Sequence, residues 1–293
     1  MLSRVIVAVA LVLCALIGPA NAEEKDRRHA VDTQAGNDKW TFGREIKFDF
    51  EGFEACVIVP KGRVDRSRRW IWDAPGYLVM RGKQGVEHTF YVEMLLAKGF
   101  HVVGLETGPT LGSPAGAEIY HRFYKAITKQ YHLNQKARLV AQSNGGLLLF
   151  AWAFRHPECV DRIFGIMPVL DFRTWPGLDW VVDPSPIDKI IGIGAITPKE
   201  LGYKLTRSEL ERRIAEFNPI DNLKPMADAG IRIFLIHGDE DGTVPIGPNS
   251  EELVRRYRAF GGQVELQVAH GFGHTTPLPV YYESERALRF LIE

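Results

Sequence analysis

Hydrophobic and polar residues alternate along this chain with two different periods, one typical of strands and one of helices. Two alternating stretches, residues 42–50 and 53–60, meet at Glu51-Gly52, which predicts an antiparallel hairpin. After the hairpin, short apolar runs typical of buried strands alternate with segments of helical period. The strand candidates are residues 69–74, 101–105, 138–142, 162–167, 231–237 and 263–268, and the helix candidates are residues 86–98, 115–131, 145–155, 250–260 and 281–292.

This alternation predicts an α/β fold with a mostly parallel central sheet and helices on both faces, because each parallel connection needs a crossover. The pattern is interrupted once at length, over residues 171–224, which are rich in Pro, Gly and Trp and include a helical stretch at 208–217. We expect this insertion to form a cap over the C-terminal edge of the sheet; an irregular surface loop is the alternative. Residues 40–293 then form one domain.

The first 22 residues have a basic start at Arg4, an apolar run over residues 5–17 and a small-residue exit at 20–22. This layout is typical of a signal peptide, and the apolar run is shorter than the roughly 20 residues of a membrane span. We therefore expect cleavage after Ala22 and a secreted or periplasmic protein without stable membrane association. An uncleaved anchor is the alternative. Residues 23–39 are polar and predict a flexible leader.

The charge balance excludes some partners. The chain has 36 Lys and Arg residues and 36 Asp and Glu residues, so its formal net charge is zero. Such a chain offers no basic field for nucleic acid and no polybasic anchor for anionic lipid. Beyond the predicted signal peptide only Cys56 and Cys159 remain, and they could pair or stay as buried thiols. The sequence has no H-E-x-x-H motif or Cys/His cluster, so we expect no metal and no organic cofactor.

A candidate nucleophile lies where the strand 138–142 passes into a helix. Ala141-Gln142-Ser143-Asn144-Gly145 resembles the nucleophile elbow G-x-S-x-G of α/β-hydrolases, with alanine in place of the first glycine. Small residues are needed there because the strand and the helix approach closely around a sharp turn. A helix cap is the alternative role for Ser143. A serine hydroxyl is a weak nucleophile unless a base removes its proton, so a histidine is required elsewhere.

A candidate acid follows the strand 231–237. Residues 237–245, H-G-D-E-D-G-T-V-P, resemble the H-G-x-x-D-x-x-V-P segment of α/β-hydrolases. The resemblance implies that Asp241 orients the catalytic histidine. Two alternatives remain. Asp239 fits a turn former better, and Asp171 follows the preceding strand, where some members of the family place the acid.

A candidate base follows the last predicted strand. Residues 271–274, G-F-G-H, resemble the family's G-x-G-H pattern, which implies that His274 is the base and leaves His270 a structural role. The order Ser, Asp, His, each after a strand, is the order that this fold requires. From Phe42 onward the chain resembles exported bacterial serine hydrolases with a dienelactone-hydrolase or prolyl-oligopeptidase-like catalytic domain.

The resemblance implies hydrolysis of carboxylic esters through a Ser-His-Asp triad and an acyl-enzyme intermediate. The substrates would be small-molecule or polysaccharide esters, including acyl or uronate esters of polysaccharides. A serine peptidase of the prolyl-oligopeptidase-like type is one alternative, although the propeller domain of those enzymes is absent from this sequence. A non-catalytic binding protein on a hydrolase scaffold is another.

Acyl transfer also needs donors for the oxyanion, commonly two backbone N–H groups. One is expected from Asn144 and the other from Gly76 or Tyr77, because Pro75 has no N–H; the Tyr77 hydroxyl is a further alternative. The Gly- and Pro-rich loop 106–116 is expected to frame the pocket. Candidate substrate contacts are the cap aromatics Phe172, Trp175 and Trp180, for which packing of the cap onto the core is the alternative.

Overall fold

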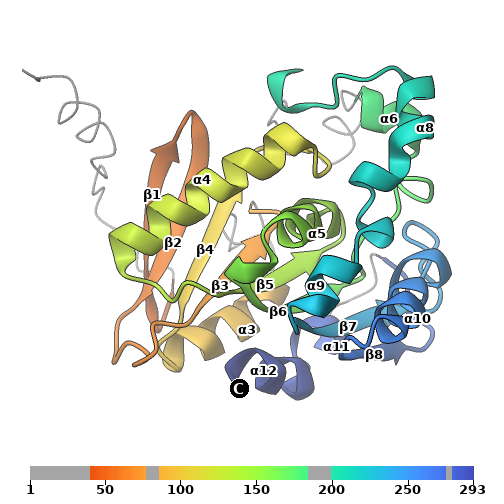
Figure 1. The fold of residues 1–293 in the computed structure, drawn as a ribbon. Helices are drawn as coiled ribbons and strands as arrows, with labels where there is room; N and C mark the ends of the chain where they lie inside the picture. Colours follow the sequence, from red (N-terminus) through yellow and green to blue (C-terminus); the bar gives the residue numbers. More distant parts are fainter. Residues whose placement is uncertain (1–39, 77–85, 184–198, 275–278) are drawn as a thin grey trace, which may run out of the picture. The chain divides into compact units, whose positions relative to one another are not determined.

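The structure is a computed structural model that describes residues 40–76, 86–183, 199–274 and 279–293 (Figure 1). The predicted signal peptide, the predicted leader and Tyr77 lie outside the described residues. In the part of the chain that is described, no helix is both long enough and apolar enough to cross a bilayer.

Within these ranges the strands form one eight-stranded sheet in the order β1-β2-β4-β3-β5-β6-β7-β8. Strand β2 runs antiparallel to β1 and to β4, and every other neighbouring pair is parallel. The predicted mostly parallel sheet with an N-terminal antiparallel hairpin is therefore confirmed. The strands are β1 (Gly43–Phe50), β2 (Phe53–Pro60), β3 (Trp70–Ala74), β4 (His101–Glu106), β5 (Ala137–Gln142), β6 (Val160–Ile166), β7 (Arg232–Gly238) and β8 (Val264–Ala269).

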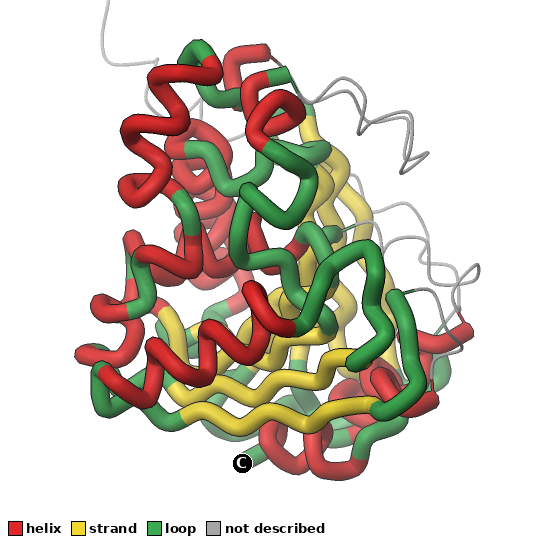
Figure 2. Tube along the Cα trace, turned by 90° about the vertical axis from the view of Figure 1, so that its right-hand side faces the viewer, coloured by secondary structure: helices red, strands yellow, loops and turns green. Residues whose placement is uncertain are grey.

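Helices cover both faces of the sheet (Figures 1 and 2). One buried cluster joins the sheet to α4 (Pro114–Tyr131), α5 (Gly145–Arg155), α9 (Lys224–Asp228) and α10 (Glu252–Ala259). The other joins it to α3 (Val86–Ala97), α11 (Pro279–Tyr282) and α12 (Glu285–Ile292). Successive side chains of a strand point to opposite faces, so Trp70 and Trp72 of β3 belong to the first cluster and Ile71 to the second. Since both faces are covered, all of β3 is buried.

The last predicted helix, residues 281–292, is divided in the structure. It ends as α11 at Tyr282 and begins again as α12 at Glu285. Ser284 caps α12, because its hydroxyl accepts the N–H of Ala287 at 3.2 Å. A serine in this role satisfies a backbone donor that a continuous helix would have bonded to a carbonyl. Apolar periodicity does not reveal such a break.

The described part of the insertion 171–224 packs at the C-terminal edge of the sheet. It contains α6 (Leu178–Val182), η3 (Lys199–Leu201), α8 (Arg207–Phe217) and η4 (Pro219–Asp221). Its buried side chains form a third cluster with Leu111, Leu147 and Val244. These three residues follow the carboxyl ends of β4, β5 and β7, which is where a cap over the site was expected.

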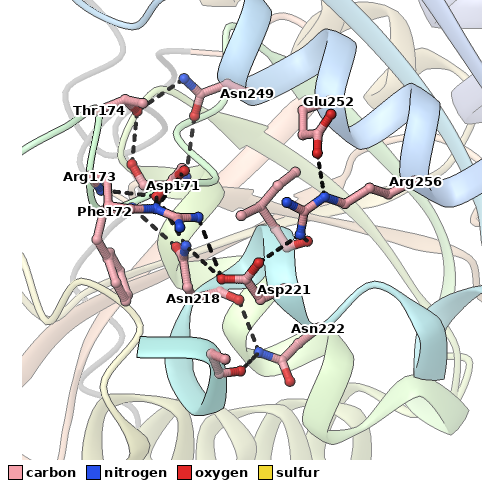
Figure 3. Close-up of polar contacts among 12 residues, drawn as sticks. Asp171, Phe172, Arg173, Thr174, Asn218, Asp221, Asn222, Asn249, Glu252 and Arg256 are labelled. Carbon is pink, nitrogen blue, oxygen red and sulfur yellow. Dashed lines mark hydrogen bonds and ion pairs between the residues drawn. The ribbon is translucent and has the colours of Figure 1, made fainter. Parts of the chain in front are cut away.

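Two buried amide side chains hold the start of the cap in place, Asn249 from the core and Asn218 from within the cap (Figure 3). Asn249 accepts the N–H of Leu170 at 2.8 Å and donates to the carbonyl of Pro245 at 2.9 Å. Asn218 accepts the N–H of Phe172 at 3.1 Å and donates to the carboxylate of Asp171 at 3.0 Å. Both amides are fully buried, so these bonds satisfy polar groups that water does not reach.

Both remaining cysteines are free and buried. Cys56 and Cys159 form no disulfide with each other. The question of their pairing, left open by the sequence, is answered in favour of two buried thiols.

Candidate active site

Ser143 lies in the sharp turn between β5 and α5. Its φ angle is +48°, in the left-handed region that a non-glycine residue rarely adopts. Backbone hydrogen bonds hold it there: its N–H donates to the carbonyl of Ile166 (3.0 Å), and its own carbonyl accepts the N–H groups of Val169 (2.8 Å) and Gly146 (2.9 Å). A Cβ atom on Gly145 would lie 2.0 Å from the carbonyl oxygen of Ala74. The glycine two residues after the serine is therefore required by close approach of two backbones.

The three residues proposed from the motifs meet in one hydrogen-bonded chain. Ser143 Oγ lies 2.9 Å from His274 Nε2, and His274 Nδ1 lies 2.7 Å from Asp241 Oδ2. Since the carboxylate only accepts, the ring donates from Nδ1, and in neutral histidine this leaves Nε2 free to accept the serine proton. The structure thus brings together the hydroxyl, the imidazole and the carboxylate in the order that nucleophilic catalysis needs.

The acid is held ionised by its surroundings. Oδ1 of Asp241 accepts the N–H groups of Thr243 at 3.0 Å and Val244 at 2.7 Å. Burial of the carboxyl raises its pKa, but hydrogen bonds from His237, His274 and the Val244 N–H outweigh burial and hold the pKa of Asp241 well below its ordinary value. The carboxylate is therefore available to orient and stabilise a protonated His274.

His237 lies beside Asp241 and supports it, a role that the sequence motifs did not indicate. Its ring is fully buried. Nε2 lies 2.8 Å from the carbonyl of Val244 and 3.4 Å from Oδ2 of Asp241, and Nδ1 lies 2.7 Å from the Ser250 hydroxyl. Because a carbonyl only accepts, Nε2 carries a proton, and in the neutral ring Nδ1 then accepts from Ser250. The first letter of the H-G-x-x-D segment was the signal that could have identified this residue.

The two alternative acids have other partners. Asp171 accepts hydrogen bonds from Arg173 and Asn218 at the base of the cap (Figure 3). Asp239 accepts the N–H of Gly271 at 2.7 Å, and its other oxygen lies 2.8 Å from Nδ1 of His270. Neither contacts His274, so the carboxylate beside the candidate base is that of Asp241.

Two of the expected oxyanion donors lie beside the nucleophile turn. Asn144 directly follows Ser143. The peptide group between Ala74 and Pro75, just before Gly76, lies so close to Gly145 that a side chain there would not fit. In the described part of the chain the N–H groups of Asn144 and Gly76 have no hydrogen-bond acceptor. Both residues are buried, and a buried donor without a partner is uncommon in proteins. These N–H groups are thus free to bind a ligand oxygen.

The cap aromatics mainly pack the cap. The ring of Phe172 is fully buried and meets Tyr203 edge to face, with 5.7 Å between ring centroids. Trp175 and Trp180 are half-buried against the same cluster. The hydroxyl of Tyr203 also donates to the carbonyl of Leu111 at 3.2 Å, which ties the loop 106–116 to the cap. Among the described residues no group of three or more His, Cys, Asp or Glu side chains is arranged to hold a metal ion.

The fold is that of the α/β-hydrolases. Over 85% of this chain the structure is similar to Porphyromonas gingivalis dipeptidyl peptidase 4 (TM-score 0.59, 12% identity), and over 86% it is similar to an acylaminoacyl peptidase of Pyrococcus horikoshii (TM-score 0.59, 14% identity). A thermostable esterase is similar over 85% (TM-score 0.54, 17% identity). The chain spans 35% and 42% of the two peptidases and 62% of the esterase. No family model matches the sequence, and no curated protein matches it.

Proposed function

We propose that the protein is a serine hydrolase that cleaves carboxylic esters, with Ser143 as nucleophile, His274 as base and Asp241 as acid. The observation that carries this proposal is the continuous hydrogen-bonded chain from the Ser143 hydroxyl through His274 to Asp241. The solved structures that share the fold include peptidases and an esterase, which supports hydrolysis as the reaction class.

The reaction has two halves. Oγ of Ser143 attacks the ester carbonyl carbon while Nε2 of His274 takes its proton, and the N–H groups of Asn144 and Gly76 stabilise the oxyanion that forms. Protonated His274 then gives the proton to the leaving alcohol as the carbon–oxygen bond breaks, which leaves the acyl group on Ser143. In the second half a water molecule, deprotonated by His274, attacks the acyl group, and the acid departs as Ser143 regains its proton.

A peptidase activity is the second candidate, because dipeptidyl peptidase 4 and acylaminoacyl peptidase share the fold. The chain spans less than half of either. We keep carboxylic esters, including acyl or uronate esters of polysaccharides, as the proposed substrates. Turnover of p-nitrophenyl acetate and butyrate, compared with that of aminoacyl and prolyl p-nitroanilides, separates the two. Ester turnover at least as fast as anilide turnover supports the proposal, and cleavage of anilides alone would assign the peptidase.

Fluorophosphonate labelling tests the nucleophile. The wild-type protein should react covalently, and Ser143→Ala should not. A wild type that resists the probe would favour a non-catalytic binding protein on the same scaffold.

We also propose that the protein is exported after cleavage behind Ala22. The support is the basic start, the apolar run and the small-residue exit of residues 1–22. N-terminal sequencing of the protein expressed with its first 22 residues in a bacterial host should give Glu23 as the first residue. An intact N-terminus in the cell-associated fraction would contradict export by cleavage.

A further inference from the structure

The loop that carries His274 is fastened to the loop that carries Asp241. Strands β7 and β8 pair as far as Gly238 and Ala269, and two more backbone hydrogen bonds continue past their ends, from Asp239 to Ala269 at 3.2 Å and from Glu240 to Phe272 at 3.1 Å. A Cβ atom on Gly238 would lie only 2.0 Å from the carbonyl oxygen of Phe272. The two loops are therefore in direct backbone contact just before the two catalytic candidates.

One side chain joins these loops at two points. Oδ1 of Asp239 accepts the N–H of Gly271 at 2.7 Å, and Oδ2 lies 2.8 Å from Nδ1 of His270. Asp239 stands two residues before Asp241, and Gly271 stands three residues before His274. A shift of Gly271 would therefore move the imidazole relative to its acid.

Gly271 is also the place where the base loop could move. Its φ angle is +76°, and a Cβ atom there would meet nothing within 4 Å. No side chain therefore packs against Gly271 on that side, and its N–H is held by the Asp239 carboxylate. The ring of His270 is 84% exposed, so Asp239 is its main attachment among the described residues. Further along, the Tyr281 hydroxyl donates to the carbonyl of Gly273 at 3.0 Å, which fixes the other end of the loop.

We propose that Asp239 is a positioning residue that sets the distance between His274 and Asp241 by clamping Gly271 and His270. This inference rests on the proposed function, since it concerns the geometry of the same triad. The sequence suggested only a turn former at this position. The carboxylate instead crosses to a loop 31 and 32 residues further along the chain.

The effect of Asp239 on the geometry of the site can be separated from its effect on the stability of the fold. The Asp239 side chain is 37% exposed, and exposed pairs of this kind contribute little to stability. Catalysis is far more sensitive, because a displacement of about 1 Å in a reacting group can cost on the order of 100-fold in rate. A substitution of Asp239 should therefore lower the catalytic rate strongly and the stability of the fold only slightly.

The test compares Asp239→Ala and Asp239→Asn with Asp228→Ala. Asp228 is a matched control, an exposed aspartate of α9 that pairs with Lys224 at 2.6 Å, remote from both loops in sequence. The measurements are kcat and KM for p-nitrophenyl acetate, the rate of fluorophosphonate labelling, the Tm, and hydrogen exchange of the segment 270–274.

Asp239→Ala should lower kcat and the labelling rate about 10- to 100-fold with KM within about twofold, because only the reacting geometry changes. Exchange in the segment 270–274 should become faster, while the Tm falls by no more than about 3 °C. Asp239→Asn should lie between wild type and Asp239→Ala, since its carbonyl oxygen can still accept the N–H of Gly271. Asp228→Ala should match wild type in kcat and in exchange of this segment.

An Asp239→Ala variant with wild-type kcat and labelling rate would overturn the clamp, and so would a loss no larger than that of Asp228→Ala. A fall in kcat that is explained by an equal fall in folded protein would also overturn it. A wild type that neither hydrolyses esters nor reacts with the probe would instead refute the proposed function. The two failures are therefore distinguishable.

Discussion

Asp241→Asn tests the assignment of the acid with almost no change in shape. Oδ1 of Asp241 accepts the N–H groups of Thr243 and Val244, so an asparagine must keep its carbonyl oxygen at that position. Its amide nitrogen then takes the place of Oδ2 and faces Nδ1 of His274 across 2.7 Å. Two donors cannot share this contact, so the ring should move its proton to Nε2. In that tautomer it cannot accept the proton of Ser143.

The expected loss follows from the tautomer. A histidine that is held as the wrong tautomer costs about 10³- to 10⁴-fold in kcat, or about 4 to 5.5 kcal/mol in the barrier. KM for a small ester should change little, because binding does not depend on the tautomer. The assay is steady-state hydrolysis of p-nitrophenyl acetate by folded protein, with the Tm recorded for each variant.

Asp171→Asn is the matched control, since Asp171 is a second buried aspartate that follows a strand of the sheet. Its carboxylate binds Arg173 and Asn218 at the base of the cap, so the substitution should act on the Tm more than on kcat. An active Asp241→Asn variant beside an inactive but folded Asp171→Asn variant would refute the reasoning.

Three further predictions concern the framework of the site. Asp73 is buried, and burial raises its pKa from 3.8 to about 7. Between these two pH values the folded protein holds a proton that the unfolded chain has lost. The free energy of unfolding should therefore fall as pH rises from about 4 to about 7, by at most about 4 kcal/mol. Asp73→Asn should abolish this fall in a series of urea titrations, and an unchanged pH profile would contradict it. Gly145→Ala should lower the Tm and abolish activity, because its methyl group would lie 2.0 Å from the Ala74 carbonyl oxygen; a fully active variant would show that the two backbones separate easily. Arg162→Leu removes the guanidinium that donates to the carbonyl of Phe290 at 2.5 Å in the last turn of α12. The free energy of unfolding should fall by about 1.5–3 kcal/mol, with faster hydrogen exchange in α12 and unchanged ester turnover. Unaltered exchange in α12 would show that this hydrogen bond does not hold the helix.

The sequence predicted the sheet and the closeness of Ser143, Asp241 and His274 because both depend on local patterns. Apolar runs identified each buried strand, and in parallel strands the carboxyl ends share one edge, so residues just after β5, β7 and β8 had to lie near one another. The motifs then selected Ser143, Asp241 and His274 from the residues at that edge. Ala141 departs from the usual glycine and is fully buried in the core beside the elbow.

The supporting contacts were not predictable in the same way, because they join polar side chains that are distant in sequence. Asn249 reaches Leu170 across 79 positions, and Asp239 reaches His270 across 31. Neither residue carries a periodic or motif signal that names its partner. Phe172 illustrates the same limit for apolar residues, since pattern alone did not distinguish a substrate contact from the buried packing residue that the structure contains.

The most direct test of the central claim is the covalent intermediate itself. Wild-type protein mixed with p-nitrophenyl acetate and quenched in acid within milliseconds should gain the mass of one acetyl group, and peptide mapping should place that group on Ser143. Ser143→Ala should gain none. A hydrolytically active wild type that carries no acyl group, or carries it on another residue, would contradict the account.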